Sequence, residues 1–119
     1  MSRKQIPKKI REQVYEKYNG HCAYCGCKLE YKDMQVDHVK SVCANGDNNI
    51  DNLLPSCRMC NFYKGIADIE YLRKQLETLH DRLQKTFIYR LALKYGLISE
   101  HKKKIKFYFE KEQENETYC

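Results

Sequence analysis

The sequence contains no tryptophan, and it has no apolar run approaching the roughly 20 residues that a membrane-spanning helix needs. Its first ten residues, MSRKQIPKKI, also lack the apolar stretch of a secretory signal. These absences argue against a membrane protein and against a secreted one, so we expect a cytoplasmic protein that does not bind membranes. No internal repeat and no low-complexity linker is present, and residues 1–119 are expected to form a single domain.

The hydrophobic content is modest as well, at 42% of the residues, so a chain of this length can bury only a modest core. A metal ion that ties segments together would help such a chain to fold. The sequence contains seven cysteines. In a reducing compartment, paired cysteines indicate metal binding more often than disulfides, and the odd number argues against a complete disulfide framework.

Positive charge exceeds negative charge, with 22 lysines and arginines against 16 acidic residues and a net charge of +6. Part of the excess lies in two clusters: Arg3, Lys4, Lys8, Lys9 and Arg11, then Lys102, Lys103, Lys104 and Lys106. Two basic clusters around a compact centre favour contact with phosphates. The alternative is that these lysine-rich segments are only solvated.

The first half of the chain predicts one helix and one strand. Residues 7–19 predict a helix, because Pro7 suits a first helical turn and Ile10, Val14 and Tyr18 recur on one face. Residues 34–39 predict a short strand, with Asp37 and its neighbour His38 on opposite faces. Residues 41–52 are rich in Asn, Asp and Gly and predict a loop.

The second half predicts mainly helices. A helix is expected to start near Cys60, and a longer one over residues 68–84 has an amphipathic leucine-rich face. Another is expected over 85–95, ended by Gly96. Residues 105–110 (IKFYFE) predict a strand, and residues 111–119 a frayed tail. The domain thus divides into a motif core over about residues 11–65, a helical extension over about 66–110 and the tail.

The cysteines indicate one structural zinc site. Cys22 and Cys25 form one Cys-x-x-Cys pair, and Cys57 and Cys60 form another. Each such pair lets two sulfurs reach one ion from a single turn, and two pairs complete the tetrahedron that Zn²⁺ prefers. A four-cysteine site is coordinatively closed, so this zinc is expected to hold the fold together. The alternative, a thiol redox protein, would use the same spacing for cycling disulfides.

Three further cysteines lie outside these two pairs. Cys27 lies close to Cys25 and could offer a competing ligand, although a free thiol is the simpler interpretation. Cys43 is expected to be a small loop or core residue, and Cys119 a thiol of the tail.

The chain between and after the cysteine pairs resembles the HNH endonucleases, the ββα-metal nuclease family, in their four-cysteine zinc subgroup. The resemblance covers residues 11–65 and depends on the ordered segments CAYC, VDH, IDNLLPSC and CRMCNFYKG. The end of the chain, IKFYFEK, is similar to that of some small phage-type members, a weaker match. The resemblance implies an α+β fold: a ββα-metal core with a four-cysteine structural zinc, additional C-terminal helices and a short strand.

The resemblance also implies roles for five residues. His38 would be the general base that takes a proton from water, and histidine suits that task at neutral pH. Asp37 and Asn61 would hold one catalytic Mg²⁺ or Mn²⁺ ion through hard oxygen ligands. Asn52 would brace the loop and orient the base. Lys64, one helical turn after Asn61, would meet a phosphate.

Each of these residues has a plainer interpretation. His38 beside Asp37 could be a hydrogen-bonded surface pair, and Asn52 a turn residue. Asn61 could cap a helix, and Lys64 could be a solvated charge. One departure from the family pattern lies after the Asp-His pair, where residues 40–46 (KSVCANG) stand in place of a segment with Pro and Gly-Gly.

The sequence therefore predicts a divalent-metal-dependent DNA endonuclease or nickase, from a phage or a mobile element. Double-stranded DNA is the expected substrate, and a larger phage or mobile-element machine is a candidate partner. A monomer would nick DNA, whereas a homodimer could cut both strands. The competing hypothesis is a catalytically silent, zinc-stabilised protein that binds nucleic acid or inhibits a partner on the same fold.

Overall fold

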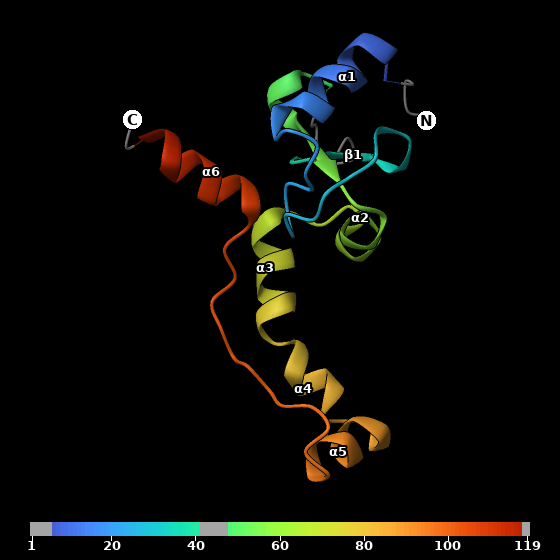
Figure 1. Ribbon diagram of the computed structural model, residues 1–119, viewed down its shortest axis with the longest axis vertical. Coiled ribbons are helices and arrows are strands. Elements are labelled where there is room, and N and C mark those ends of the chain that lie inside the picture. The colour runs from blue at the N-terminus through green and yellow to red at the C-terminus, as the bar shows by residue number, and fades with distance from the viewer. Residues whose placement is uncertain (1–5, 41–47, 118–119) are drawn as a thin grey trace. The chain divides into compact units, whose positions relative to one another are not determined.

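The computed structural model describes residues 6–40 and 48–117, with side chains described as far as residue 112 (Figure 1). The chain divides into two compact units, Met1–Ile69 with Lys106–Cys119, and Glu70–Ile105. The predictions for Arg3, Lys4, Cys43 and Cys119 concern positions outside the described residues. The expectation that residues 1–119 form one domain stays a prediction.

The first unit contains a two-stranded antiparallel sheet. Strand β1 (Gln35–His38) pairs with strand β2 (Leu53–Ser56), so that Asp37 lies opposite Leu54. The strand predicted over residues 34–39 is thus confirmed. All four residues of β2 are buried, which explains why this segment shows no alternating pattern in the sequence.

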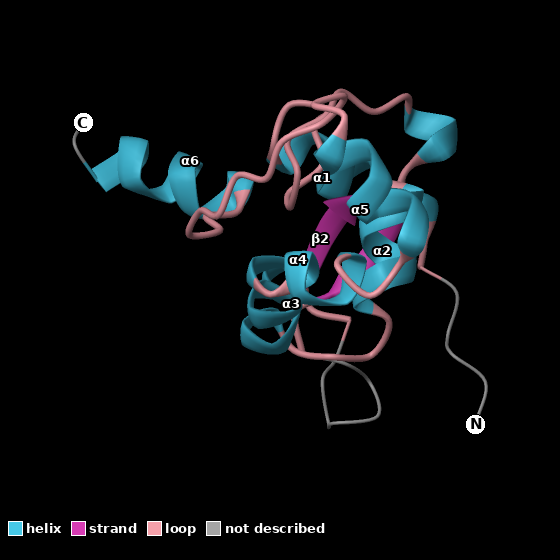
Figure 2. Cartoon of the chain, turned by 90° about the horizontal axis from the view of Figure 1, so that it is seen from below, coloured by secondary structure: helices cyan, strands magenta, loops and turns pink. Residues whose placement is uncertain are grey.

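Two helices accompany the sheet (Figure 2). Helix α1 (Lys8–Lys17) packs against β2 and confirms the predicted first helix. Lys17 joins the two elements, because its Nζ donates to the carbonyls of Ile50 and Leu53 at 2.9 and 2.8 Å. Helix α2 (Arg58–Lys64) packs against β1 and completes the ββα arrangement expected from the family resemblance.

The second unit contains three helices: α3 (Ile69–Glu77), which begins on the last residue of the first segment, α4 (Leu79–Leu83) and α5 (Phe87–Lys94). The prediction of a single helix over residues 68–84 is wrong, because the helix is interrupted at Thr78. The Thr78 hydroxyl donates to the Lys74 carbonyl at 2.8 Å, and the Arg82 guanidinium donates to the Gln75 carbonyl. These side chains occupy carbonyls at the end of α3. Helix α5 ends before Gly96, as predicted for the helix over residues 85–95.

The strand predicted over residues 105–110 is also wrong. Helix α6 (Tyr108–Thr117) begins there, and it extends into the segment predicted to be a frayed tail. Three hydrogen bonds define its start: the Phe107 N–H donates to the Glu110 carboxylate, and the next two N–H groups donate to the carbonyls of Tyr24 and Ala23. The first amide N–H groups of the helix are therefore satisfied by its own glutamate and by carbonyls of the turn between Cys22 and Cys25.

Phe107, Tyr108 and Phe109, at the start of α6, form an aromatic anchor on the turn that contains Cys22 and Cys25. Phe107 is 2% exposed and meets the Tyr24 ring edge to face, at 5.4 Å between centroids. Tyr108 stacks on His21 at 5.5 Å. A partial alternation of apolar and polar residues, together with these aromatics, produced the strand prediction, but here the aromatics dock the start of a helix.

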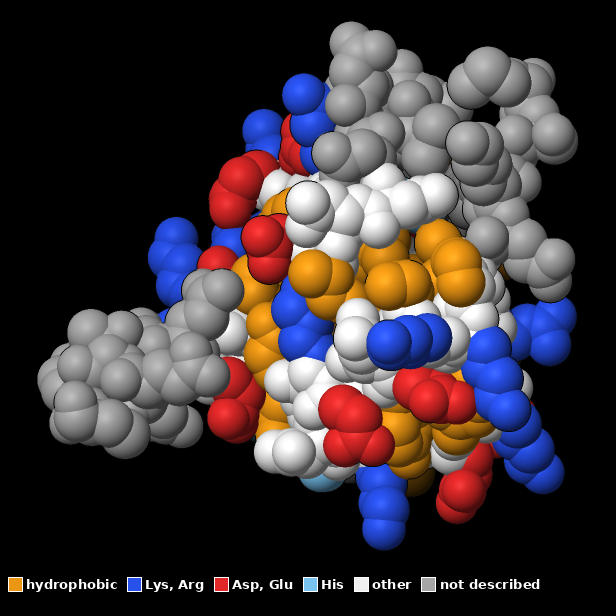
Figure 3. Space-filling model, turned by 90° about the horizontal axis from the view of Figure 1, so that it is seen from above, with side chains coloured by type: hydrophobic (Ala, Val, Ile, Leu, Met, Phe, Trp, Pro, Cys, Tyr) orange, Lys and Arg blue, Asp and Glu red, His pale blue; other side chains and the backbone are white. Residues whose placement is uncertain are grey.

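The described residues of the two predicted basic clusters differ in their surroundings. Arg11, from the first cluster, donates instead to the carbonyls of Tyr31 and Met34, each at 2.8 Å. Lys8, Lys9 and the lysines of the second cluster are exposed. On the face drawn in Figure 3, lysine and arginine side chains are interspersed with acidic ones. None of the helices in the described part of the chain has the length and apolar character required to cross a bilayer.

The aromatic anchor makes Gly26 hard to replace. Its φ of +81° favours glycine, and an added Cβ would lie 2.7 Å from the Tyr108 ring. We expect Gly26→Ala to lower the free energy of unfolding by about 1–3 kcal/mol, measured by urea denaturation, and to speed zinc release to a chelator.

Gly96→Ala is the matched control, because Gly96 also has positive φ but nothing lies near its added Cβ. It should carry the backbone strain alone and leave zinc release unchanged. Equal zinc release from the two variants would contradict the contact between Gly26 and Tyr108.

Candidate metal centre and active site

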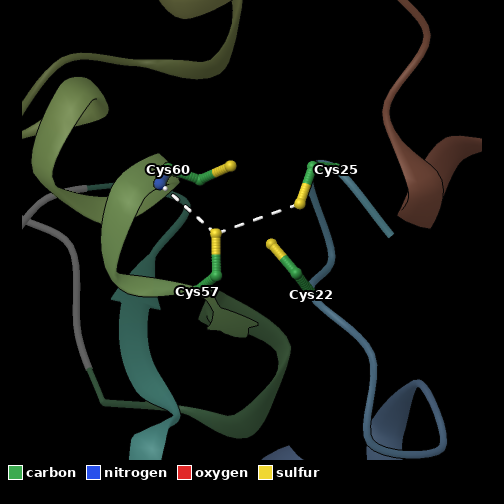
Figure 4. A group of neighbouring side chains, drawn as sticks. All are labelled: Cys22, Cys25, Cys57 and Cys60. Carbon is green, nitrogen blue, oxygen red and sulfur yellow. Dashed lines mark hydrogen bonds between the residues drawn. The ribbon is translucent and has the colours of Figure 1, made fainter. Parts of the chain in front are cut away.

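Four cysteine sulfurs converge at the start of α2 (Figure 4). The Sγ atoms of Cys22, Cys25, Cys57 and Cys60 all lie within 4.8 Å of one another, and those of Cys25 and Cys57 are 3.9 Å apart. A tetrahedral zinc site with Zn–S bonds of 2.3 Å has sulfurs about 3.8 Å apart. This cluster can therefore hold a metal ion, and its size fits zinc.

The electrostatics of the cluster favour a thiolate at its buried end. A hydrogen bond from the Cys60 thiol, aided by main-chain N–H groups, lowers the pKa of Cys22 to about 4 in spite of burial. The same hydrogen bond raises the pKa of Cys60. A bound metal would displace the remaining thiol protons, because thiolates are the metal-binding form.

Cys27 lies outside this group of four. Its side chain is exposed, and desolvation together with the Cys25 thiol raises its pKa to about 12. The structure thus favours the interpretation of Cys27 as a free thiol.

Asp37 is held in place by two donors that contact the same carboxylate oxygen. Its Oδ2 accepts a hydrogen bond from the Tyr24 hydroxyl and lies 3.0 Å from Lys64 Nζ. Burial and the neighbouring carboxylate raise the pKa of Tyr24 well above its usual range, so the phenol stays protonated and donates. Within the described residues, Oδ1 has no such partner.

Lys64 occupies a different place from the one expected for a phosphate ligand. Its side chain is 0% exposed, and Nζ donates to the His38 carbonyl at 3.0 Å as well as pairing with Asp37. The ammonium therefore faces the interior between α2 and β1. Its spacing after Asn61 suggested a surface charge, and only tertiary contacts reveal the buried pair.

His38 is held by a residue that sequence reasoning missed. The imidazole is 7% exposed, and its Nε2 lies 2.7 Å from Asn48 Oδ1. An amide oxygen only accepts, so Nε2 carries the proton in the neutral ring and Nδ1 keeps its lone pair. The sequence marked Asn48 merely as part of an Asn-rich loop, which gives no signal for this contact.

Asn52 closes the loop that follows β1. Its side chain accepts from the Lys40 N–H at 2.8 Å and donates to the Lys40 carbonyl at 2.9 Å. Its own carbonyl accepts from the Val39 N–H at 2.9 Å. These bonds link the end of β1 to the start of β2, whereas contact with the His38 ring comes from Asn48.

Asn61 lies on α2, one turn before Lys64, so the two side chains share a face of the helix. The residue is half-buried, and in the described part of the chain its side-chain amide has no hydrogen-bond partner. An amide oxygen and the open Asp37 Oδ1 are both hard ligands. The chemistry of each oxygen suits a divalent cation such as Mg²⁺, which commonly takes only one or two protein ligands.

Comparison with known proteins relates this core to nucleases. The family model described as HNH endonuclease matches residues 22–65. The chain is 43% identical to the Septu protein PtuB of Bacillus thuringiensis over 50% of its length, and 34% identical to the CRISPR-associated endonuclease Cas9 of Corynebacterium diphtheriae over 46%. These alignments span 24% and 5% of the two relatives, so each is matched only in part.

A solved structure shows the same fold. The Type II-C Cas9 enzyme from Actinomyces naeslundii matches 63% of this chain with a TM-score of 0.52, at 22% sequence identity and over 8% of its own length. A protein of Bacillus subtilis named as an SPbeta prophage-derived HNH endonuclease, YoqL, is 34% identical over 40% of the chain and is covered to 24%.

The cysteine cluster leads to a prediction about metal content. We expect wild-type protein to bind one zinc ion per chain by atomic emission, and Cys57→Ser to lose the zinc and unfold, because metal binding and folding are coupled. Cys27→Ser is the matched control and should keep both. Loss of zinc from Cys27→Ser, or a folded zinc-free Cys57→Ser protein, would contradict the site.

Proposed function

Because the chain carries an HNH endonuclease domain over residues 22–65, we propose that it is a divalent-metal-dependent DNA endonuclease that hydrolyses phosphodiester bonds. The observation that supports this best is the arrangement of two buried neighbours: His38, with Nε2 bonded to Asn48, and Asp37, with one carboxylate oxygen open. One residue offers a base and the other a cation ligand.

In this proposal His38 is the general base. Nδ1 accepts the proton of the attacking water, while the Nε2–H bond to Asn48 keeps the ring in one tautomer and one orientation. Asn52 holds the main chain next to His38, since its side chain bonds the N–H and the carbonyl of Lys40, two residues further on.

Asp37 and Asn61 would hold the catalytic cation, Mg²⁺ or Mn²⁺. When bound, such an ion would supply positive charge that stabilises the phosphate and the leaving oxygen. Asp37 offers Oδ1 for this purpose, because Tyr24 and Lys64 engage Oδ2. Asn61 offers its amide oxygen from α2. The zinc that we propose for the four cysteines would have no part in the chemistry, since its coordination sphere is full.

The proposed substrate is double-stranded DNA, in keeping with the net charge of +6 and with endonuclease relatives that include a prophage-derived one. We propose a cytoplasmic protein of phage or mobile-element origin that acts alone or with a larger machine. One site cuts one strand, so a monomer would nick and a homodimer would be needed for a double-strand break.

The decisive assay is cleavage of supercoiled plasmid with Mg²⁺ or Mn²⁺. We expect the wild type to nick the plasmid and His38→Ala to be slower by about a hundredfold or more, the usual contribution of a general base. His101→Ala is the matched control, because His101 is exposed and lies in the second unit.

Two results would contradict the proposal in different ways. Equal cleavage by His38→Ala would exclude His38 as the base. Plasmid binding without cleavage in either metal would instead favour the catalytically silent binding protein on the same fold.

A second prediction concerns Asn48. We expect Asn48→Ala to slow cleavage on the order of tenfold, since the loss of one hydrogen bond is worth about 1.4 kcal/mol in the transition state. Nitrogen chemical shifts of the His38 ring should report the Nε2–H tautomer in the wild type and a mixture in the variant.

Asn49→Ala is the control for this measurement, because the Asn49 side chain accepts from the Asp51 N–H. It should leave the His38 ring shifts as they are. A wild-type ring protonated at Nδ1 would contradict the assignment of Asn48.

A further inference from the structure

Lys64 is a buried cation in a small protein, and its surroundings define what it does. Its side chain is 0% exposed, and its two polar partners are Asp37 Oδ2 and the His38 carbonyl, each at 3.0 Å. Burial of a charge is unfavourable unless the charge is paired and hydrogen-bonded. The Asp37 carboxylate is therefore the partner that permits Lys64 to lie there, and the reverse holds equally.

The contacts on Asp37 are one-sided. Both Lys64 and the Tyr24 hydroxyl engage Oδ2, and in the described part of the chain Oδ1 has no hydrogen-bond or ion-pair partner. Two donors on one oxygen fix the rotation of the carboxylate group. The result is a carboxylate with one oxygen committed to the protein and one oxygen available.

We propose that Lys64 is a positioning residue that serves as the resident countercharge of Asp37: with Tyr24 it holds Oδ2, reserves Oδ1 for a divalent cation, and keeps the cation affinity of the free protein low. This inference rests on the proposed role of Asp37 as a cation ligand. It replaces the role of a phosphate ligand for Lys64, because a fully buried ammonium with two protein partners does not face substrate.

The low affinity follows from Coulomb's law. A divalent ion on Oδ1 would lie on the same carboxylate as the ammonium on Oδ2, so the two positive charges would repel across a few ångströms with little water between them. A substrate phosphate near the cation would offset this repulsion. The free protein should therefore bind the cation weakly, and nucleic acid should strengthen the binding.

The second donor, Tyr24, is itself supported from the far end of the chain. Its ring meets Phe107 edge to face at 5.4 Å and Phe109 at 6.2 Å, and its carbonyl accepts from the Tyr108 N–H. The aromatic anchor thus holds Tyr24, which in turn holds Asp37. The C-terminal segment of the first unit thus helps to position Asp37, the proposed cation ligand, through Tyr24.

The test is a titration of the intact zinc-loaded protein with Mn²⁺, followed by electron paramagnetic resonance. We expect Lys64→Met to bind Mn²⁺ at least about tenfold more tightly than the wild type, because the repelling charge is gone. Without divalent cation the same variant should melt at a lower temperature than the wild type. Mn²⁺ should restore most of that loss by replacing the missing countercharge.

Lys17→Met is the matched control. Lys17 is also partly buried and donates to two carbonyls, but it does not contact Asp37. Its replacement should lower the melting temperature without changing Mn²⁺ affinity, and Mn²⁺ should not restore it. The double variant Asp37→Asn with Lys64→Met should lose the response to Mn²⁺, which separates an effect through Asp37 from a general one.

Lys64→Gln provides a second variant that keeps an N–H donor in the buried site and removes only the charge. If either variant folds only when Mn²⁺ is present, the proposal is supported. If both stay unfolded with Mn²⁺, or if Mn²⁺ affinity is unchanged or lower, Lys64 does not act as the countercharge. A zinc content of one per chain in each sample excludes exchange at the cysteines.

These readouts do not depend on cleavage. A wild type that fails to cut plasmid while Lys64→Met binds Mn²⁺ more tightly would overturn the proposed endonuclease activity and leave the role of Lys64 intact. Conversely, a protein that cuts plasmid in a His38-dependent way with unchanged Mn²⁺ affinity in Lys64→Met would retain the nuclease and overturn the inference.

Discussion

The convergence of four cysteine sulfurs on one point is the constraint on which the first unit depends. It joins the turn at Cys22 and Cys25 to the start of α2, two segments that are far apart in the sequence. The hydrophobic core around it is small, with Val14, Leu53 and Phe107 among its few fully buried large side chains. A metal ion bound by four thiolates would link these segments more firmly than so small a core could.

The two cysteine pairs also position the candidate active site. Tyr24 lies inside the first cysteine pair and donates to Asp37, and Lys64 lies one turn beyond the second pair on α2 and contacts the same oxygen. Each side of the cysteine cluster thus delivers one donor to one carboxylate. The cysteine cluster and the proposed catalytic site are thus coupled through two side chains, those of Tyr24 and Lys64.

The alternation along β1 raised a difficulty, because it sends the side chains of Asp37 and His38 to opposite faces. Lys64 shows how the strand still acts as one unit, since it bonds the side chain of Asp37 and the main-chain carbonyl of His38. The His38 ring is held separately by Asn48, from beyond the loop. Neighbouring residues with opposite side-chain directions can thus be fixed by donors that arrive from different elements.

By itself the sequence determined which four cysteines come together, the order of the motif, helix α1 and strand β1, because these follow from local spacing and periodicity. The tertiary structure alone decided the burial of Lys64, the contact between Asn48 and His38, and the helix that begins at Tyr108 in place of a strand. Each of these depends on hydrogen bonds to partners distant along the chain. A sequence pattern states what a segment favours, whereas the partner that satisfies its polar groups is known only once the chain has folded.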